Sequence, residues 1–263
     1  MIRVFLSGAS GNVGKAIVRA IAARDDIQLV GGWCLDVGKD LGILAGIEPL
    51  EVTASSNLDE GLAETRPDIV IDFTSANLLQ KNFTSYLHAN LNAVIGTTGL
   101  TEADEAACRA RVEEKGLRWA VIATYSIGMN MIADFVRKMR AYYPYVSVLD
   151  QFTDEMANAP SGTACWLAEV IGGDVCKAKT REVYPGAMGA TVNDVRLLSR
   201  RLPWPGAFAE HEILMSCGDE TVKITVEGYS SEIYTNGVLM TAEKLAAMPA
   251  GTFITNLMKI IEA

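Results

Sequence analysis

Short apolar runs rich in β-branched residues alternate with segments of helical periodicity through the first half of the chain. The runs at 2–7, 27–35, 69–73, 93–96 and 119–123 have the length and composition of buried strands. Helical spacing of apolar residues begins at Val13, and further helices are predicted at 58–65, at 78–89, and from a capping box at Thr101 and Asp104 to residue 115. This alternation predicts an α/β fold with a Rossmann-like, doubly wound parallel sheet.

The pattern changes after Ser126. An apolar helix is predicted at 129–139, and strands follow at 146–152, 192–197, 208–215 and 221–226, separated by loops rich in proline and glycine. Several strands with one or two helices indicate a second α+β domain with a mixed or antiparallel sheet. The segment 237–263 becomes helical again. We therefore expect two domains, residues 1–126 and 127–237, with residues 238–263 packing back on the first.

Composition excludes several classes of function. The 263 residues carry a formal net charge of −9, which argues against binding nucleic acid or an anionic membrane surface. No apolar run approaches the roughly 18–20 residues of a membrane span. The five cysteines are scattered and odd in number, as is typical of reduced thiols in a cytoplasmic protein. With only two histidines, His88 and His211, no metal site is predicted.

A glycine-rich segment, GASGNVG at residues 8–14, follows the first strand and opens the first helix. Glycines let the backbone approach a pyrophosphate, and the helix N-terminus supplies amide donors. Asp36 lies 22 residues beyond Gly14, near the distance at which an acidic residue holds the adenosine ribose. The pattern predicts a dinucleotide site, and the alternative is a turn needed only for chain reversal.

Three further motifs follow in order. The first, residues 96–99 (GTTG), ends a strand, where α/β sheets bind ligands. The second, residues 125–130 (YSIGMN), marks the change of domain. The third, residues 158–164 (NAPSGTA), precedes a predicted helix at 165–171, whose free amides and neighbouring hydroxyls would cradle a carboxylate. The alternative for this third motif is a plain helix cap at Ser161.

Together these motifs resemble the dihydrodipicolinate reductase family, in order and over almost the whole chain. The resemblance implies NADH or NADPH as cofactor, hydride transfer to a cyclic carboxylated substrate, a second domain for substrate and oligomerisation, and a homotetramer. It places cofactor contacts at Gly8, Ser10, Gly11, Asn12, Val13, Asp36, Phe73, Thr74, Gly96, Thr98 and Tyr125. Substrate contacts are expected at Thr98, Phe152, Met156, Ser161, Gly162 and Thr163.

The sequence departs from the family just before the cradle. The family carries a His-His pair and a lysine there, and counting back from Pro160 these positions hold Phe152, Thr153 and Met156. An expected arginine is Glu232. Charge-assisted hydrogen bonds contribute about 1.5–3 kcal/mol each. Losing several would weaken binding of a dicarboxylate strongly, so the residues favour a ring substrate with one carboxylate.

Three hypotheses remain open from the residues. The first is a reductase of a cyclic imine or unsaturated ring carboxylic acid other than the usual dicarboxylate. The second is a divergent but genuine 4-hydroxy-tetrahydrodipicolinate reductase of lysine and diaminopimelate biosynthesis, and the third is a non-catalytic nucleotide-binding regulatory protein. Candidate proton donors are Tyr125, Asp154, Glu155 and Tyr234. His211 is interpreted as structural, and the pair Arg200–Arg201 as a loop segment that is solvated or at a subunit contact.

Overall fold

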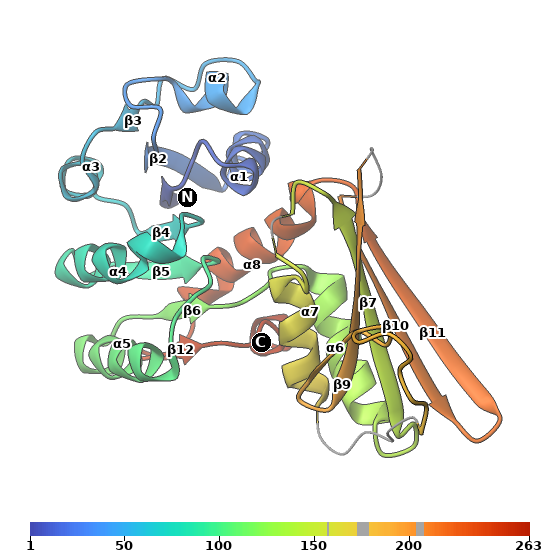
Figure 1. Cartoon of the computed structure of the whole chain (residues 1–263). Helices are drawn as coiled ribbons and strands as arrows, with labels where there is room; N and C mark the ends of the chain where they lie inside the picture. The colour runs from blue at the N-terminus through green and yellow to red at the C-terminus, as the bar shows by residue number, and fades with distance from the viewer. Residues whose placement is uncertain (157, 173–178, 204–207) are drawn as a thin grey trace. The chain divides into compact units, whose positions relative to one another are not determined.

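The computed structural model describes residues 1–156, 158–172, 179–203 and 208–263. The chain forms two compact units (Figure 1). Unit 1 comprises Met1–Ser126 and Tyr234–Ala263, and unit 2 comprises Ile127–Ile233. Each unit has its own sheet and its own core.

Unit 1 is built on a seven-stranded parallel sheet in the order β12-β6-β5-β4-β1-β2-β3. Its strands are β1 (Ile2–Ser7), β2 (Ile27–Trp33), β3 (Ala54–Ser55), β4 (Ile69–Asp72), β5 (Asn92–Ile95), β6 (Trp119–Val121) and β12 (Phe253–Ile254). All four residues of β4 are buried, as a strand covered by helices on both faces requires. The prediction of a Rossmann-like sheet is confirmed.

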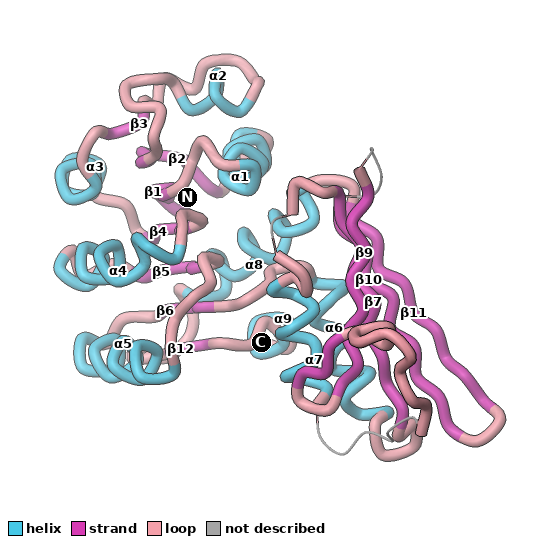
Figure 2. The backbone as a smooth tube through the Cα atoms, viewed as in Figure 1, coloured by secondary structure: helices cyan, strands magenta, loops and turns pink. Residues whose placement is uncertain are grey.

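Helices cover both faces of this sheet (Figures 1 and 2). One face carries α3 (Leu58–Thr65), α4 (Leu79–His88) and α5 (Glu102–Lys115), and the other carries α1 (Asn12–Ala22) and α8 (Thr235–Leu245). The shorter helices are α2 (Leu41–Ala45), the 3₁₀ turn η1 (Ala76–Leu78) and α9 (Met258–Ile261). The predicted capping box of α5 is confirmed, with Thr101 and Asp104 each accepting a hydrogen bond from the other's backbone amide.

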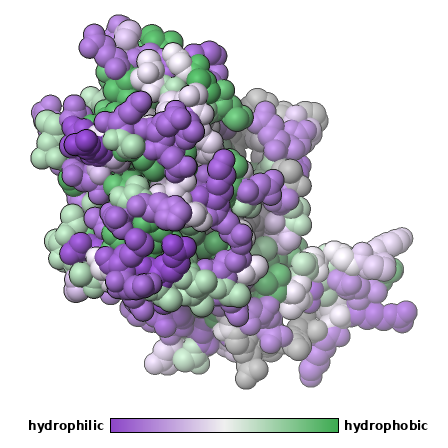
Figure 3. Space-filling model, turned by 90° about the vertical axis from the view of Figure 1, so that its left-hand side faces the viewer, coloured by the Kyte–Doolittle hydropathy of each residue, from purple (hydrophilic) through white to green (hydrophobic). Residues whose placement is uncertain are grey.

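The core under α4 and α5 is aromatic. Phe83 and Tyr86 pack edge-on against Trp119, at ring-centroid distances of 5.1 and 6.3 Å, and the Trp119 indole donates to the carbonyl of Leu91. The outer side of unit 1 is mostly hydrophilic with small hydrophobic areas between (Figure 3). The helices are therefore amphipathic, with their apolar faces on the sheet.

Unit 2 holds a five-stranded mixed sheet in the order β11-β10-β7-β9-β8, in which only β7 and β9 pair in parallel. Its strands are β7 (Tyr145–Thr153), β8 (Ala190–Val192), β9 (Val195–Leu202), β10 (Ala209–Cys217) and β11 (Glu220–Gly228). Helices α6 (Ile127–Met139) and α7 (Gly162–Ile171) pack on one face around a core that includes Val148, Leu167 and Ile213, and the turn η2 (Ser231–Tyr234) follows β11. The predicted α+β fold is confirmed.

Three sequence-based assignments of elements are wrong in detail. Residues 192–197, predicted as one strand, contain a hairpin turn, because Asn193 and Asp194 take the left-handed conformation that reverses the chain. The segment 237–263 is not all helical, since Phe253–Ile254 pairs with β6. Strand β2 ends at Trp33 rather than at residue 35, so Asp36 lies in the turn beyond it.

Candidate active site

The glycines of the first loop serve different purposes. Gly8 has φ +85°, and a Cβ there would collide with the carbonyl oxygen of Phe73. A Cβ on Gly14 would collide with the carbonyl oxygen of Gly8. At Gly11 a Cβ would meet only that same oxygen, at 3.3 Å, and φ is an ordinary −71°. The fold itself requires Gly8 and Gly14, whereas Gly11 leaves open the space in front of the loop.

Helix α1 begins directly at this open space. Its N-cap is Gly11, so no side chain caps the helix, and the first helical hydrogen bond runs from Lys15 to the carbonyl of Gly11. The amides of Asn12 and Val13 lie in the first turn, where a helix offers no backbone acceptor. Two unused amides at the positive end of a helix dipole form an anion site suited to a pyrophosphate.

Two cavities adjoin the loop. One, of about 450 Å³, lies between the ends of β2 and β4 and is lined by residues that include Trp33, Leu35, Phe73 and Leu78. The other, of about 460 Å³, lies between the start of α1 and the ends of β4 and β5 and is lined by Gly11, Asn12, Val13, Thr74, Gly96 and Thr98, among others. The first is mainly apolar and the second more polar, as the adenosine and pyrophosphate–nicotinamide parts of a dinucleotide require.

Asp36 lies just past the end of β2 and is bonded to a cation. Lys39 donates to its carboxylate at 2.6 Å. The bond from Lys39 lowers the pKa of Asp36, and partial desolvation opposes the shift. A carboxylate that can accept from ribose hydroxyls therefore stands beside an ammonium that can pair with a phosphate.

The ring of Phe73, which follows β4, packs against Gly96 at the end of β5. A Cβ on Gly96 would collide with the ring of Phe73, whose other neighbour is Tyr125 at a centroid distance of 5.9 Å. Tyr125 is 1 % exposed, and its hydroxyl lies 3.1 and 3.0 Å from the carbonyl oxygens of Ile95 and Ala120, while burial raises its pKa well above the usual value. This geometry makes Tyr125 a support for the strand ends rather than a proton donor. Thr98 is exposed at the cavity.

The residues around the first loop fit a dinucleotide cofactor. The anion site has amide donors without a side-chain cap, Gly11 keeps its front clear, and the two cavities continue it on either side. The sequence-predicted cofactor residues from Gly8 to Tyr125 thus lie at one edge of one sheet, the carboxyl edge.

Unit 2 presents a second helix N-terminus at α7. Ser161 is the N-cap, and its hydroxyl accepts from the amide of Ala164 at 3.2 Å, as the cap reading of the sequence predicts. Ser161 is 1 % exposed, and its amide donates to Asp150 at 2.8 Å. Because the hydroxyl caps the helix and the residue is buried, its side chain stabilises the fold. Gly162 is exposed, a Cβ added to it would meet nothing within 4 Å, and Thr163 is half-buried. Their first-turn amides are the donors of the carboxylate cradle that the sequence predicts.

An ion pair between Arg201 and Asp150 lies next to this cradle. Its geometry corrects the sequence-based interpretation of the pair Arg200–Arg201 as a loop segment. Arg201 lies on β9, not in a loop, with 18 % of its side chain exposed. It donates to Asp150 at 3.2 Å and to the carbonyl of Asn158 at 2.6 Å. Burial raises the pKa of Asp150, but hydrogen bonds from Ser199, Ser161 and Arg201 outweigh it and hold that pKa below its usual value.

Phe152 packs against the same ion pair. Its ring, 6 % exposed, lies 5.2 Å below the Arg201 guanidinium and meets His211 edge-on at 5.6 Å. The His211 ring nitrogen Nε2 lies 3.5 Å from the Ser161 hydroxyl, and burial lowers the pKa of His211 to about 4, with Asp150 opposing and Arg201 adding to the shift. The structural interpretation of His211 agrees with this packing. Phe152 is buried too deeply to be a principal substrate contact.

The remaining candidate donors lie in different surroundings. Asp154 and Glu155 are exposed in the turn after β7, and Met156 beside them is half-buried. Burial raises the pKa of Tyr234. Of the four candidates, Asp154 and Glu155 have the exposure that direct contact with a substrate requires.

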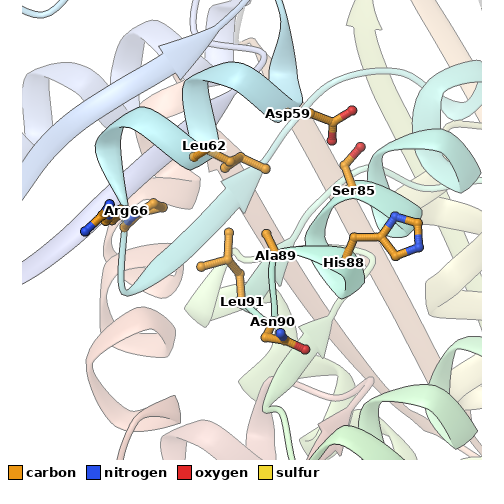
Figure 4. Close-up of a pocket in the computed structure, with 10 residues that line it drawn as sticks. Asp59, Leu62, Arg66, Ser85, His88, Ala89, Asn90 and Leu91 are labelled. Carbon is orange, nitrogen blue, oxygen red and sulfur yellow. The ribbon is translucent and has the colours of Figure 1, made fainter.

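A third cavity, of about 630 Å³, lies between α3 and α4 near the amino ends of β4 and β5 (Figure 4). Leu62, Ala89 and Leu91 form its apolar part, while Arg66 and His88 lie toward opposite ends. It is remote from the carboxyl edge, and we assign it no catalytic role. In the part of the chain that the structure describes, no group of three His, Cys, Asp or Glu residues could hold a metal ion, and no helix is long and apolar enough to cross a membrane.

A Rossmann-like sheet whose glycine loop opens on paired cavities is typical of dinucleotide-dependent oxidoreductases. Comparison with known proteins specifies the family. Residues 2–124 match dihydrodipicolinate reductase, N-terminus, and residues 127–260 match dihydrodipicolinate reductase, C-terminus. The chain therefore belongs to the dihydrodipicolinate reductase family and is an NAD(P)H-dependent oxidoreductase.

Known relatives align with this chain over nearly its full length. The 4-hydroxy-tetrahydrodipicolinate reductase of Desulfitobacterium hafniense is 32% identical over 254 residues, 94% of each chain. That of Synechococcus elongatus is 31% identical over 257 residues, 93% of each chain. A dipicolinate-bound dihydrodipicolinate reductase from Paenisporosarcina sp. TG-14 superposes over 99% of both chains with a TM-score of 0.81 and 25% identity.

The sequence alone assigned no role to two charged residues close to these sites, Asp72, buried at the end of β4, and Arg201, paired with Asp150. A charged residue that ends a fully apolar strand was a usable signal for Asp72. No local signal identified Arg201, because its partners lie on β7 and in the following loop.

Proposed function

We propose that this chain transfers a hydride from NADH or NADPH to the C=N bond of a ring that carries a carboxylate. The observation that carries the proposal is a pair of helix N-termini with free first-turn amides, one on each unit: the start of α1 behind Gly11 and the start of α7 at Gly162 and Thr163. When bound, the nicotinamide supplies the hydride. The protein's part is to bind and orient both reactants.

The cofactor would be held by unit 1. The amides of Asn12 and Val13 would bind the pyrophosphate, Asp36 and Lys39 would meet the adenosine ribose, and Thr98 would lie beside the nicotinamide. The apolar cavity at Leu35 and Phe73 would take the adenine. In unit 2, the amides of Gly162 and Thr163 would bind the substrate carboxylate, with the Thr163 hydroxyl as a further donor.

The simplest substrate is that of the relatives, 4-hydroxy-tetrahydrodipicolinate. The supporting fact is their coverage, since both units match and the aligned region includes 94% of the chain. Arg201 places one cation close to the cradle, although its charge is already balanced by Asp150.

A second candidate, a ring imine with a single carboxylate, is favoured by the residues at the end of β7 and in the turn that follows it. Phe152 is buried, Met156 is neutral, and the exposed neighbours Asp154 and Glu155 are acidic. A second substrate carboxylate would therefore meet negative charge rather than the lysine of the family pattern, and its desolvation would not be offset. The C=N bond, if protonated, accepts a hydride without a separate proton donor.

A substrate panel decides between these candidates. Purified protein is mixed with NADH and either 4-hydroxy-tetrahydrodipicolinate or a six-membered ring imine with one carboxylate, and NADH oxidation is followed at 340 nm. A kcat/KM within the usual range of roughly 10⁴–10⁸ M⁻¹s⁻¹ on the dicarboxylate establishes the first candidate. That range on the monocarboxylate alone establishes the second. Tight NADH binding without turnover of either substrate would overturn the catalytic proposal in favour of a regulatory role.

We also propose that copies of the chain associate, as a homotetramer, through the face of the unit 2 sheet opposite to the described helices α6 and α7. Helices α6 and α7 cover one face, and the side chains on the other include the partly exposed Leu149, Leu198 and Leu214. A hydrogen bond between Gln151 and Glu210 flanks these leucines. Sedimentation of the wild type and of Leu214→Glu tests this, since a monomer in both would refute it.

A further inference from the structure

Asp72 is a buried carboxylate at the carboxyl end of β4. It is 0 % exposed and accepts five hydrogen bonds. Its Oδ1 accepts from the Thr74 amide at 2.9 Å and from the hydroxyls of Thr74 and Thr97 at 2.8 Å each. Its Oδ2 accepts from the Asn82 amide at 3.0 Å and from the Tyr86 hydroxyl at 2.6 Å. Both oxygens are thus fully used as acceptors.

These donors belong to the loops that form the cofactor edge. Thr74 follows β4 and Thr97 follows β5, and the Thr74 amide also donates to the Thr97 hydroxyl at 2.8 Å. The Tyr86 hydroxyl lies 2.8 Å from that of Ser7, the residue before Gly8. One carboxylate therefore connects the ends of β1, β4 and β5, from which the glycine loop and the walls of the more polar cavity extend.

All five donors are neutral, so this network does not cancel the charge of Asp72 with a cation. Two of the residues bonded to it, Thr74 and Thr97, line the cavity between α1 and the ends of β4 and β5. The carboxylate therefore lies directly behind the cavity wall. Because Asp72 is fully buried, water screens its charge less than it screens a charge at the surface.

We propose that Asp72 is a positioning residue for the nicotinamide cofactor and that its negative charge favours the oxidised, positively charged nicotinamide ring over the reduced one. This inference rests on the proposed function, which places the nicotinamide beside Thr98. Loss of a hydride turns the neutral ring into a cation. A fixed negative charge behind the cavity stabilises that cation, and hence also the transition state in which the positive charge develops.

Asp72→Asn removes the charge from a side chain of nearly the same shape, and it also replaces one of the two acceptor oxygens by an amide donor. The lost hydrogen bonds affect both forms of the cofactor alike, so the charge is measured by the ratio of the two dissociation constants. Binding of NAD⁺ and NADH to the wild type and the variant is measured by calorimetry, with thermal unfolding as a check on the fold. We expect the NAD⁺ dissociation constant of Asp72→Asn to rise about tenfold more than that of NADH. A purely structural role would weaken the binding of both forms equally.

Tyr86→Phe tests the positioning role while leaving the charge in place. It removes the hydroxyl that connects Asp72 with Ser7, so both dissociation constants should rise together, with an unchanged ratio. Tyr143→Phe is the matched control, because it removes a similar bond to a carboxylate, that of Glu220 at 2.6 Å, in unit 2. It should leave both constants unchanged.

The outcomes are distinct. Unchanged cofactor affinity in folded Tyr86→Phe overturns the positioning role, and this result is decisive even if Asp72→Asn does not fold. Equal weakening of NAD⁺ and NADH in folded Asp72→Asn overturns the electrostatic role. Failure of the wild type to bind either form would instead refute the proposed function.

Discussion

Substitution of Gly11 is the sharpest test of the cofactor site, because the structure separates ligand approach from folding there. A new Cβ would contact only the carbonyl oxygen of Gly8, at 3.3 Å, and φ of −71° suits any residue. That contact is tight, and the Gly8 carbonyl would have to shift by a few tenths of an ångström, far less than a Cβ at Gly14 demands, so the fold should tolerate Gly11→Val. The valine methyl groups would occupy the space in front of the amides of Asn12 and Val13, which is the proposed pyrophosphate site.

The magnitude follows from those amides. A charge-assisted hydrogen bond contributes about 1.5–3 kcal/mol, and 1.4 kcal/mol corresponds to tenfold in affinity. Loss of one such bond should thus weaken NADH binding by roughly 10- to 150-fold. Gly11→Ala, with a smaller side chain, should give a smaller loss in the same direction.

The assay is calorimetric titration with NADH and NADPH, paired with thermal unfolding. Gly14→Ala is the contrasting variant, since its Cβ would collide with the backbone of Gly8 and should lower the melting temperature. Gly11→Val should keep its melting temperature nearly unchanged. Wild-type affinity for both cofactors in a folded Gly11→Val variant would refute the assignment of the pyrophosphate site.

Three further predictions follow from the structure. The protein should bind NADH modestly more tightly than NADPH. Lys39→Ala should widen this preference by weakening NADPH binding, because Lys39 is the cation that neutralises Asp36. A wild-type preference for NADPH of about tenfold would contradict this prediction. Thr163→Val should raise KM several-fold with an unchanged Kd for NADH, and equal KM values would remove Thr163 from the cradle. The pKa of His211 is lowered to about 4, so the unfolded state binds more protons between pH 6.5 and 4, and about 3 kcal/mol of stability should be lost as the pH falls through that window. Denaturant unfolding of His211→Gln should show a weaker pH dependence there, and an identical slope would refute the buried, neutral state.

Local signals in the sequence were sufficient for much of the fold. Helix α3 spans the predicted residues, and the capping box of α5 forms between Thr101 and Asp104. Periodicity succeeds here because burial imposes it on each helix and strand separately. The glycine loop was equally readable, since the positive φ of Gly8 and the close approach at Gly14 exclude other residues at those positions. The two-residue strand β12 is too short for any periodicity and could not be found in this way.

Only the tertiary structure determines which buried side chains pack behind the proposed site. Tyr86 meets Ser7 across 79 positions of sequence, and Arg201 meets Asp150 across 51. Such pairs depend on which strands become neighbours and on how side chains pack between them, and no local pattern encodes that. The sequence therefore determined the elements and the loops that face a ligand. The fold determined which buried charges stand behind them, because a buried charge persists only where distant donors converge on it.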